Sequence, residues 1–388
     1  MPVPAPARRL AFDILQDVER GGYASDRLAA RSAGIDGRDA GLASTIVFGV
    51  LRYRAPLDWL IRHFSGRSSK LDPEVRTVLR MAVFQLRHLE RVPPHAVVAD
   101  AVELVKCAHK RSAAGFVNAV LRKVDRSPVV WPDRETELSC PEWLLARWER
   151  HYDAETTRGI ALAALAEPEH YVRVPAGATP PAEAVPTEIP GCYRLAGQGT
   201  HAFRRQDIGS QSIVPLLRLE PGHRFLDLCA APGNKTAQAL ESGAPAIACD
   251  FHLHRLAQLK SLGTPLLVLD GTQPLPFAGA FDRILVDAPC SGTGTLARNP
   301  EIKWRLTPAD LGDLHRRQSA LLANARAALA PGGLLVYSTC SLEAEENEEV
   351  VAAVPPELVV GTMRRIPGRQ PGDGFYAAVI KSEKPAND

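Results

Sequence analysis

Residues 281–294, FDRILVDAPCSGTG, decide the fold of the second half of this 388-residue chain. The stretch is an apolar run that ends at Asp287 and passes at once into a glycine-rich turn containing Pro289 and Cys290. Similar short runs, rich in Val, Leu and Ile, are HRFLDLCA, PAIACD, TPLLVLD and GGLLVYSTC. Continuous apolar strands of this kind are typical of a parallel sheet that is covered on both faces.

The segments between these runs have the pattern of helices, at about 234–243, 252–262 and 308–330. Strands that alternate with helices form an open sheet with helices on both sides. Two further runs, ELVVGTM and FYAAVIK, add strands near the C-terminus. The sequence therefore predicts an α/β, doubly wound sheet of about seven strands.

The first 126 residues have a different pattern, because their apolar residues recur three and four positions apart. ARRLAFDILQDVERGG carries such a stripe and stops at a glycine pair, while DPEVRTVLRMAVFQLRHL begins with Asp72 as N-cap and Pro73 at the first helical position. PPHAVVADAVELVKCAH and SAAGFVNAVLRKV supply two more helices. With no strand pattern present, we expect an independent all-α domain at 1–126.

Residues 127–200 are less regular, with one helical stretch, PEWLLARWERHY, followed by a region rich in Pro and Gly. This segment is either a linker or a small, partly β subdomain, and the sequence does not choose between them. We therefore expect three parts, at 1–126, 127–200 and 201–388.

The net charge of +2 is the sum of two opposite balances. Residues 1–126 hold 21 Lys or Arg against 13 Asp or Glu, whereas residues 127–388 hold 25 against 31. A basic module favours an anionic partner such as nucleic acid, although solvated charge on helix faces explains the balance equally well. Arg76, Arg80 and Arg87 are four and seven residues apart, so we expect them to share a helix face and to be candidates for RNA binding.

Several classes of protein are excluded by composition. No apolar run approaches the ~20 residues of a membrane span, and MPVPAPARRL lacks the apolar core of a signal peptide, so we expect a cytoplasmic protein. The seven cysteines are scattered and form no CxxC pair, which argues against a disulfide framework and a zinc knuckle. We therefore expect no metal, and reduced thiols that are available for chemistry.

Four aspartates lie at the ends of successive predicted strands, where ligands bind in such sheets. Asp227 is followed by small residues and Pro-Gly before a helix, a turn that lets backbone amides approach an anionic group. Asp250 is placed to accept both hydroxyls of a ribose, and Asp270 to accept from an adenine amine. Each aspartate alone is more simply a loop residue or helix cap, but four in register, with Asp287, favour a nucleoside site.

Cys290 and Cys340 each follow an apolar run, in DAPCSGTG and YSTCS. They are either two small side chains packed at strand ends or parts of one reaction that needs two sulfurs.

The motifs DLCAAPGNKT, DAPCSGTG, RNPEIKWRLT and YSTCS closely resemble the signatures of RNA cytosine-5 methyltransferases that use S-adenosylmethionine. RRLAFDILQDVERGGYASDRL, VFGVLRYRAPLDWLI and GFVNAVLRKV resemble the NusB-type RNA-binding domain. A NusB-like domain fused to this catalytic domain is similar to the RsmB/Sun branch of the family, which methylates small-subunit (16S) ribosomal RNA. The resemblance covers roughly 7–126 and 201–388, and implies a NusB-like helical domain followed by a Rossmann-like class I methyltransferase domain.

The resemblance also implies roles for individual residues. Cys340 would attack C6 of the cytosine, Cys290 would assist product release, and Asp287 would orient the base. The cofactor site would comprise Cys229, Ala230, Ala231, Pro232, Gly233, Asn234, Lys235, Asp250, Asp270 and Asp287. Lys235 is also a hypothetical support for the Cys340 thiolate, since a nearby cation lowers the pKa of a thiol.

Two features qualify this interpretation. Asn234 stands where the family usually has a second glycine, and we expect it to retain cofactor binding. Arg298, Lys303 and Arg305, beside Trp304, are candidates for contacts with RNA.

The alternative functions are a cytosine-5 enzyme that acts on transfer RNA or DNA, and a non-catalytic RNA-binding assembly factor. We expect the protein to be a monomer.

Overall fold

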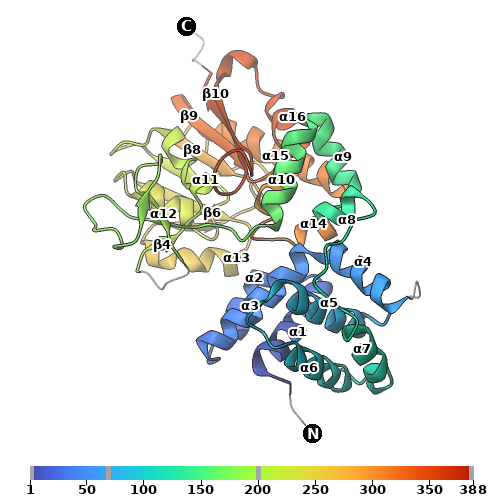
Figure 1. Cartoon of the computed structure of the whole chain (residues 1–388). Coiled ribbons are helices and arrows are strands. Elements are labelled where there is room, and N and C mark those ends of the chain that lie inside the picture. Colours follow the sequence, from blue (N-terminus) through green and yellow to red (C-terminus); the bar gives the residue numbers. More distant parts are fainter. Residues whose placement is uncertain (1–3, 67–70, 198–201, 384–388) are drawn as a thin grey trace. The chain divides into compact units, whose positions relative to one another are not determined.

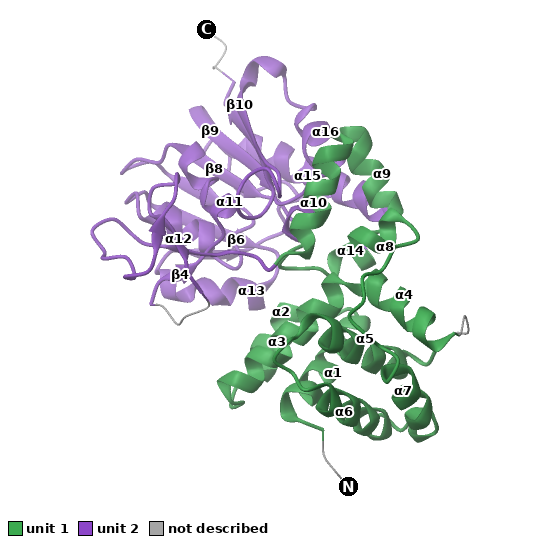
Figure 2. Ribbon diagram, in the orientation of Figure 1, with its two compact units in different colours: residues 1–166, 296–305 green, residues 167–295, 306–388 purple. Residues whose placement is uncertain are grey.

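The computed structural model describes residues 4–66, 71–197 and 202–383 (Figure 1). The chain folds into two compact units, which are coloured separately in Figure 2. Unit 1 comprises Met1–Ala166 and Leu296–Arg305, and unit 2 comprises Glu167–Thr295 and Leu306–Asp388. The chain therefore passes between the units three times. The short segment Leu296–Arg305 belongs to unit 1 although the sequence around it belongs to unit 2.

The described residues of unit 1 form helices joined by loops and no strand, as the sequence of its first part predicts. Its elements are α1 (Pro6–Glu19), α2 (Ala24–Arg31), α3 (Gly37–Arg52), α4 (Arg54–Ser65), α5 (Pro73–His88), α6 (Pro94–Cys107), the 3₁₀ turn η1 (Arg111–Ala113), α7 (Ala114–Leu121), α8 (Arg134–Leu138), α9 (Glu142–His151), α10 (Ala154–Leu165) and α14 (Ile302–Arg305). One continuous apolar core joins α1 to α7. Asp72 and Pro73 begin α5 as expected.

Helix α5 lies at the centre of unit 1. Eleven of its residues between Val75 and Leu86 are buried, and they lie on all sides of the helix. The spacing of Arg76, Arg80 and Arg87 predicts that they share one face of this helix as candidates for RNA binding. Instead Arg80 is 3% exposed, and its guanidinium pairs with Asp58 at 2.6 Å and Glu19 at 3.0 Å. A charge inside a helical core is retained only with such partners.

Unit 2 is built on a seven-stranded sheet with strand order β10-β11-β9-β8-β5-β6-β7. The strands are β5 (Phe225–Asp227), β6 (Ala246–Asp250), β7 (Leu266–Val268), β8 (Phe281–Asp287), β9 (Leu329–Thr339), β10 (Val359–Arg365) and β11 (Phe375–Lys381). Strands β5 to β9 are parallel, whereas β11 pairs antiparallel with both β9 and β10. All seven predicted strands are present, and the doubly wound α/β class is confirmed.

Helices cover both faces of this sheet. On one face α15 (Pro308–Ala328) and α16 (Glu348–Val351) pack against apolar side chains of β8 and β9. On the other, η2 (Val214–Leu217) and α12 (Asn234–Leu240) pack against β5 and β11. The remaining elements around the sheet are α11 (Ile208–Gln211), α13 (Leu253–Leu256), η3 (Ala257–Leu262), η4 (Thr293–Thr295), η5 (Ala344–Glu346) and η6 (Pro356–Leu358).

The middle of the chain is divided between the units. Residues 127–166, which contain α8 to α10, lie in unit 1. Unit 2 begins with a small antiparallel sheet of order β2-β3-β1-β4. Its strands are β1 (His170–Arg173), β2 (Val185–Pro186), β3 (Cys192–Leu195) and β4 (Arg204–Arg205). Within the described part of the chain, no helix is long and apolar enough to cross a membrane.

Candidate active site

The residues expected to carry the chemistry meet at one edge of the seven-stranded sheet. Since β5, β6, β8 and β9 are parallel neighbours or next neighbours, their carboxyl ends share that edge. Asp227, Asp250 and Asp287 are the last residues of β5, β6 and β8, and Cys340 directly follows β9. The strand order reverses between β5 and β8, which is where ligands bind in such folds.

The two cysteines are adjacent, with 3.3 Å between the Sγ atoms of Cys290 and Cys340. Both side chains are partly exposed. The pKa of Cys290 is raised well above the usual range of a thiol, first by its hydrogen bond to Cys340 and next by burial. Cys290 therefore keeps its proton at neutral pH and can donate it toward the Cys340 sulfur.

Asp287 is held by two side chains beside this pair. The Lys235 ammonium donates to its Oδ2 at 2.7 Å, and the Ser338 hydroxyl donates to its Oδ1 at 2.9 Å. Lys235 is 8% exposed, and its Nζ is 5.0 Å from the centroid of the Phe375 ring. The cation that was expected to support Cys340 thus forms its ion pair with Asp287.

The loop between β5 and α12 contains five of the predicted cofactor residues, Cys229 to Gly233. Gly233 has φ of +100°, and a Cβ there would be 2.7 Å from Cγ of Leu259, so this position requires glycine. Asn234 is instead the first residue of α12, and its side chain accepts from Arg204 at 3.2 Å and donates to the carbonyl of Arg205 at 3.4 Å. The second glycine of the family is therefore replaced at a position where the backbone is helical.

The acidic groups around the loop differ in their partners. Asp250 accepts from the backbone N–H groups of Ala231 and His252, at 3.2 and 2.9 Å, so it holds the loop against the end of β6. Asp270 accepts from the backbone and the hydroxyl of Thr272, which lower the pKa of its carboxyl.

Asp227 is 1% exposed, and burial raises its pKa to about 7. Thr236 donates to its Oδ2 at 2.7 Å, while its Oδ1 has no partner among the described residues. A buried acceptor without a donor is an atom that a bound amine can satisfy. This atom and the close-fitting Gly233 loop fit S-adenosylmethionine, which carries an amine, a carboxylate and a nucleoside.

The turn after Cys290 approaches the backbone after β9 very closely at Gly294. Its N–H donates to the carbonyl of Cys340 at 2.9 Å, and its own carbonyl accepts from Gly374 at 2.8 Å. A Cβ at this position would lie 2.4 Å from the Gly374 oxygen and 2.8 Å from the Cys340 oxygen. Only glycine lets the two cysteine loops and residue 374 meet here.

We expect Gly294→Ala to reduce the rate of the reaction at the two cysteines about tenfold or more, because the added Cβ must displace the backbone of Cys340. Gly312→Ala is the matched control, since a Cβ there meets nothing closer than 3.9 Å. Steady-state kinetics with both variants test this expectation. Equal rates for the two variants would mean that the loop relaxes without moving the thiol.

Comparison with known proteins decides the family. Residues 214–381 match the family described as 16S rRNA methyltransferase RsmB/F, and residues 5–126 match the NusB family. The ribosomal RNA small subunit methyltransferase B of Citrobacter koseri is 33% identical, covering 95% of this chain and 97% of that protein. The chain belongs to the RsmB/F family.

Other relatives agree with this assignment. The probable ribosomal RNA small subunit methyltransferase B of Bacillus subtilis is 31% identical and covers 89% of this chain and 87% of that protein. The solved structure of PH0851 has a TM-score of 0.82 at 21% identity, covering 99% and 100% of the two chains. NSun6 from Pyrococcus horikoshii with SFG has a TM-score of 0.54 at 19% identity, covering 63% and 99%. At these identities the two structures show a likeness of fold, and the NusB assignment rests on the family match at residues 5–126.

This RsmB/F member is therefore an S-adenosylmethionine-dependent RNA methyltransferase, and the resemblance seen in its sequence motifs is confirmed. When bound, S-adenosylmethionine supplies an electrophilic methyl group on its sulfonium.

The motif RNPEIKWRLT has a structural position that the sequence did not predict. Lys303 is 1% exposed and donates to the carbonyl of Arg52 at 3.1 Å, and the Trp304 indole donates to the carbonyl of Leu51 at 2.8 Å. Both acceptors are in the last turn of α3, where helix carbonyls lack partners of their own.

Arg305 and Glu301 complete this attachment. The Arg305 guanidinium donates to the carbonyls of Val18, in the last turn of α1, and of Gly22, in the loop after it. Glu301 accepts from the first N–H of α2, that of Ala24, at 2.8 Å. The segment Leu296–Arg305, which we call the clasp, thus caps three helices of unit 1. Lys303 and Arg305, two of the expected RNA contacts, are engaged by the protein itself, and Arg298 also has a partner within the structure.

Burial lowers the pKa of Lys303 to about 8, against 10.5 for an ordinary lysine. Between these values the unfolded chain holds a proton that the folded unit lacks, so this residue makes stability rise with pH from about 8 to 10.5. We expect Lys303→Met to remove about 3 kcal/mol of that rise. Urea unfolding at pH 7.5 and pH 10.5 measures the change in the free energy of unfolding between the two pH values. Lys123→Met is the control, because Lys123 is exposed. A rise that both variants retain would contradict the expectation.

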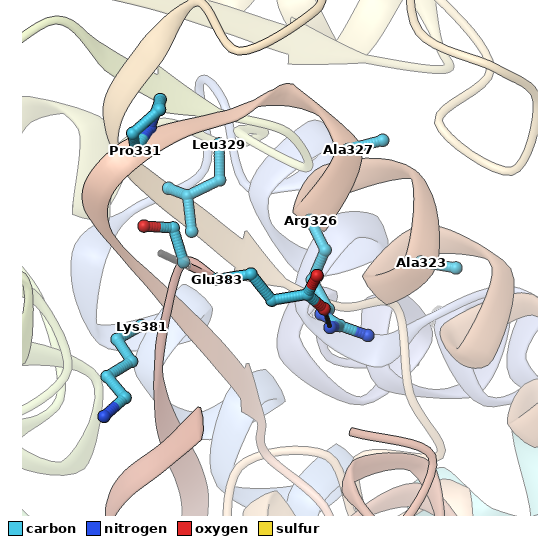
Figure 3. Close-up of a pocket in the computed structure, with 8 residues that line it drawn as sticks. Ala323, Arg326, Ala327, Leu329, Pro331, Lys381 and Glu383 are labelled. Carbon is cyan, nitrogen blue, oxygen red and sulfur yellow. Dashed lines mark hydrogen bonds and ion pairs between the residues drawn. The ribbon is translucent and has the colours of Figure 1, made fainter. Parts of the chain in front are cut away.

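Other parts of unit 2 carry none of the predicted site residues. A cavity of about 470 Å³ lies between α15, the start of β9 and the end of β11, with Arg326, Lys381 and Glu383 in its wall (Figure 3). It is at the amino end of β9, opposite the strand end that leads to Cys340. Among the described residues, no group of three or more His, Cys, Asp or Glu side chains is arranged to hold a metal ion.

Sequence reasoning missed three polar residues that hold the site. Ser338 bonds Asp287, Thr236 bonds Asp227, and Glu346 bonds the turns that follow both cysteines. Glu346 lies in the acidic run EAEENEE, six residues after Cys340, and an acidic run is usually read as solvated charge. The sequence signal that could have identified Glu346 as buried is the apolar pair Val350 and Val351, which follows the acidic run and indicates that one side of it is buried.

Proposed function

We propose that this protein transfers the methyl group of S-adenosylmethionine to C5 of a cytosine in 16S ribosomal RNA, through a covalent bond between the Cys340 sulfur and C6 of the base. The relatives named as small-subunit ribosomal RNA methyltransferases support the substrate. The observation that carries the chemistry is the 3.3 Å separation of two thiols at the ends of adjacent strands. A single packed cysteine would need no second sulfur beside it.

Each step of this reaction has a candidate residue. The Cys340 thiolate would add to C6 and move the C5=C6 electrons to C5, which could then accept the methyl group that S-adenosylmethionine supplies when bound. The C5 proton would then pass to water, the electrons of the C5–H bond would re-form the C5=C6 bond, and the C6–S bond would break to expel the Cys340 thiolate. Cys290, whose raised pKa keeps it protonated, donates a hydrogen bond to the departing Cys340 sulfur and so assists release.

Asp287 is the proposed anchor of the base. Its carboxylate would accept a hydrogen bond from the exocyclic amine of cytosine and so orient the ring for addition of the Cys340 thiolate. The ion pair with Lys235 and the bond from Ser338 fix the carboxylate before the base arrives. Such preorganisation avoids a reorganisation cost at the moment of reaction.

Cofactor binding is assigned to the loop from Cys229 to Lys235, with Asp250, Asp270 and Asp287 around it. Cys229 and Cys249 are proposed as structural thiols, because burial raises the pKa of Cys249 to about 12 and that of Cys229 well above the usual range. Neither supplies a thiolate at neutral pH.

RNA binding is proposed for unit 1, with contacts that fall mainly on phosphates. Residues 1–126 carry an excess of eight positive charges. Of the arginines named above, Arg76 and Arg87 are partly exposed and stay candidates, although the Arg87 guanidinium already donates to the carbonyls of Asp125 and Ser127. Arg80 instead pairs with Asp58 in the core. The target cytosine must leave its stack to reach the sheet edge. We expect a monomer that works in the cytoplasm, where its RNA substrate is.

Bisulfite mapping of total RNA from cells with and without the gene tests the proposal. One 16S cytosine should lose its protection from bisulfite when the gene is deleted. A loss confined to transfer RNA would reassign the substrate but keep the chemistry. An unchanged cytosine profile would overturn the activity and favour an RNA-binding assembly factor.

A further inference from the structure

A buried carboxylate lies directly behind the two cysteine turns. Glu346, in η5, has no solvent exposure, and the reaction described above does not use it. Its Oε1 accepts from the backbone N–H of Ser291 at 2.8 Å and from the Gln318 amide at 2.9 Å. Its Oε2 accepts from the hydroxyls of Ser291 and Ser341. Both oxygens are therefore satisfied, and by uncharged donors.

The donors to Glu346 are placed next to the reacting sulfurs. Ser291 follows Cys290 in the turn after β8, and Ser341 follows Cys340 in the turn after β9. Gln318 of α15 extends the same network to Cys290 from its other side, because its amide also donates to the carbonyl of Pro289 at 2.9 Å. One carboxylate thus connects the residues that flank both thiols.

Glu346 is itself fixed in place. The Tyr337 hydroxyl of β9 donates to its backbone carbonyl at 2.6 Å, and Asn347 next to it donates to the carbonyl of Ser341 at 2.9 Å and accepts from the Thr339 hydroxyl at 2.5 Å. Hydrogen bonds to a carboxylate are stronger than those between neutral groups, and burial away from water strengthens them further.

We propose that Glu346 is a positioning residue that sets the distance between the sulfurs of Cys290 and Cys340. Besides Glu346, the described hydrogen bonds between the two turns are the backbone bond at Gly294, the bond from the Leu342 N–H to the Thr293 hydroxyl at 2.9 Å, and contacts among the serine and threonine hydroxyls. The catalytic importance of that distance rests on the proposed function, in which Cys290 must reach the Cys340 sulfur. The geometric role does not rest on it and is measurable without methyl transfer.

Disulfide formation between the two thiols reports their separation. Diamide takes the two thiol hydrogens and becomes the hydrazine as the S–S bond forms, and mass spectrometry of the Cys290–Cys340 peptide pair follows the rate in the full-length protein. We expect Glu346→Ala to slow this reaction about tenfold and to lower kcat by about tenfold or more, with the KM for S-adenosylmethionine unchanged. Glu346→Gln keeps an acceptor for Ser291 and Gln318. In this variant the rate of disulfide formation and kcat should both stay within about threefold of the native values.

Two comparisons make the outcome decisive. Glu349→Ala removes an exposed acid from α16 and should leave both rates at their native values. A folded Glu346→Ala protein that forms the disulfide at the native rate overturns the proposal. If Glu346→Ala does not fold, Ser291→Ala removes one hydroxyl from the network, and a native rate in that variant overturns it equally. A native protein that forms the disulfide readily but methylates no cytosine would refute the proposed function and leave the positioning role intact.

Discussion

Cys340→Ala should abolish methyl transfer, with a loss on the order of 10⁴-fold or more, and should form no covalent bond with RNA. Cys290→Ala should instead accumulate a covalent RNA–protein adduct. The difference follows from the proposed roles of the two thiols. In that proposal Cys340 supplies the sulfur that adds to C6, whereas Cys290, whose raised pKa keeps it protonated, assists the departure of that sulfur.

The adduct is measured by denaturing gel electrophoresis of the protein with labelled 16S RNA and S-adenosylmethionine, before and after nuclease treatment. Cys107→Ala is the control, because that cysteine is exposed and belongs to unit 1, whereas Cys290 and Cys340 belong to unit 2. An adduct in Cys340→Ala but not in Cys290→Ala would exchange the two roles. No adduct in any variant would argue for methyl transfer without covalent catalysis.

Asp287→Ala should have the second largest effect, on both stability and turnover. It leaves the Lys235 ammonium, whose side chain is 10% exposed, without its carboxylate. An unpaired charge of this kind costs about 2 to 3 kcal/mol of folding free energy. Turnover should fall by about 10²-fold or more, since the base also loses its anchor. Urea unfolding and steady-state kinetics measure the two effects.

A double substitution separates stability from catalysis. Lys235→Met combined with Asp287→Ala removes both charges, so the free energy of unfolding should recover while methyl transfer stays low. Asp282→Ala at the other end of β8 is the matched control, because it breaks a more exposed ion pair with Arg224 and should cost less than about 1 kcal/mol. Recovery of turnover in the double variant would restrict Asp287 to a structural role.

The strands and the residues at their ends could be predicted because each is a local signal. The length, the apolar character and the end of a strand can all be read from a run such as FDRILVDAP. Because β8 and β9 pair in parallel, their ends place Asp287 and Cys340 at one edge of the sheet. The same rule placed Asp227 and Asp250 there. Local patterns likewise predicted the start of α5 at Asp72 and Pro73.

Residues whose roles depend on distant partners could not be predicted in this way. Arg80 has the spacing of a surface arginine, and only the folded chain brings Asp58 and Glu19 to it, 22 and 61 residues away. Lys303 and Arg305 are basic residues beside a tryptophan, which in sequence indicates a nucleic-acid contact. Their acceptors are backbone carbonyls more than 250 residues earlier, and a carbonyl leaves no mark in a sequence.

The clasp has a consequence for the order in which this protein is made. Synthesis delivers the helical sequence first, but Leu296–Arg305, which caps the ends of α1 and α3 and the start of α2, comes only after β8. A nascent chain normally completes its first domain before the second emerges. In this protein the bonds that cap three helix ends of the first unit can form only after the ribosome has synthesised the Pro-Cys turn of the second unit and the clasp that follows it.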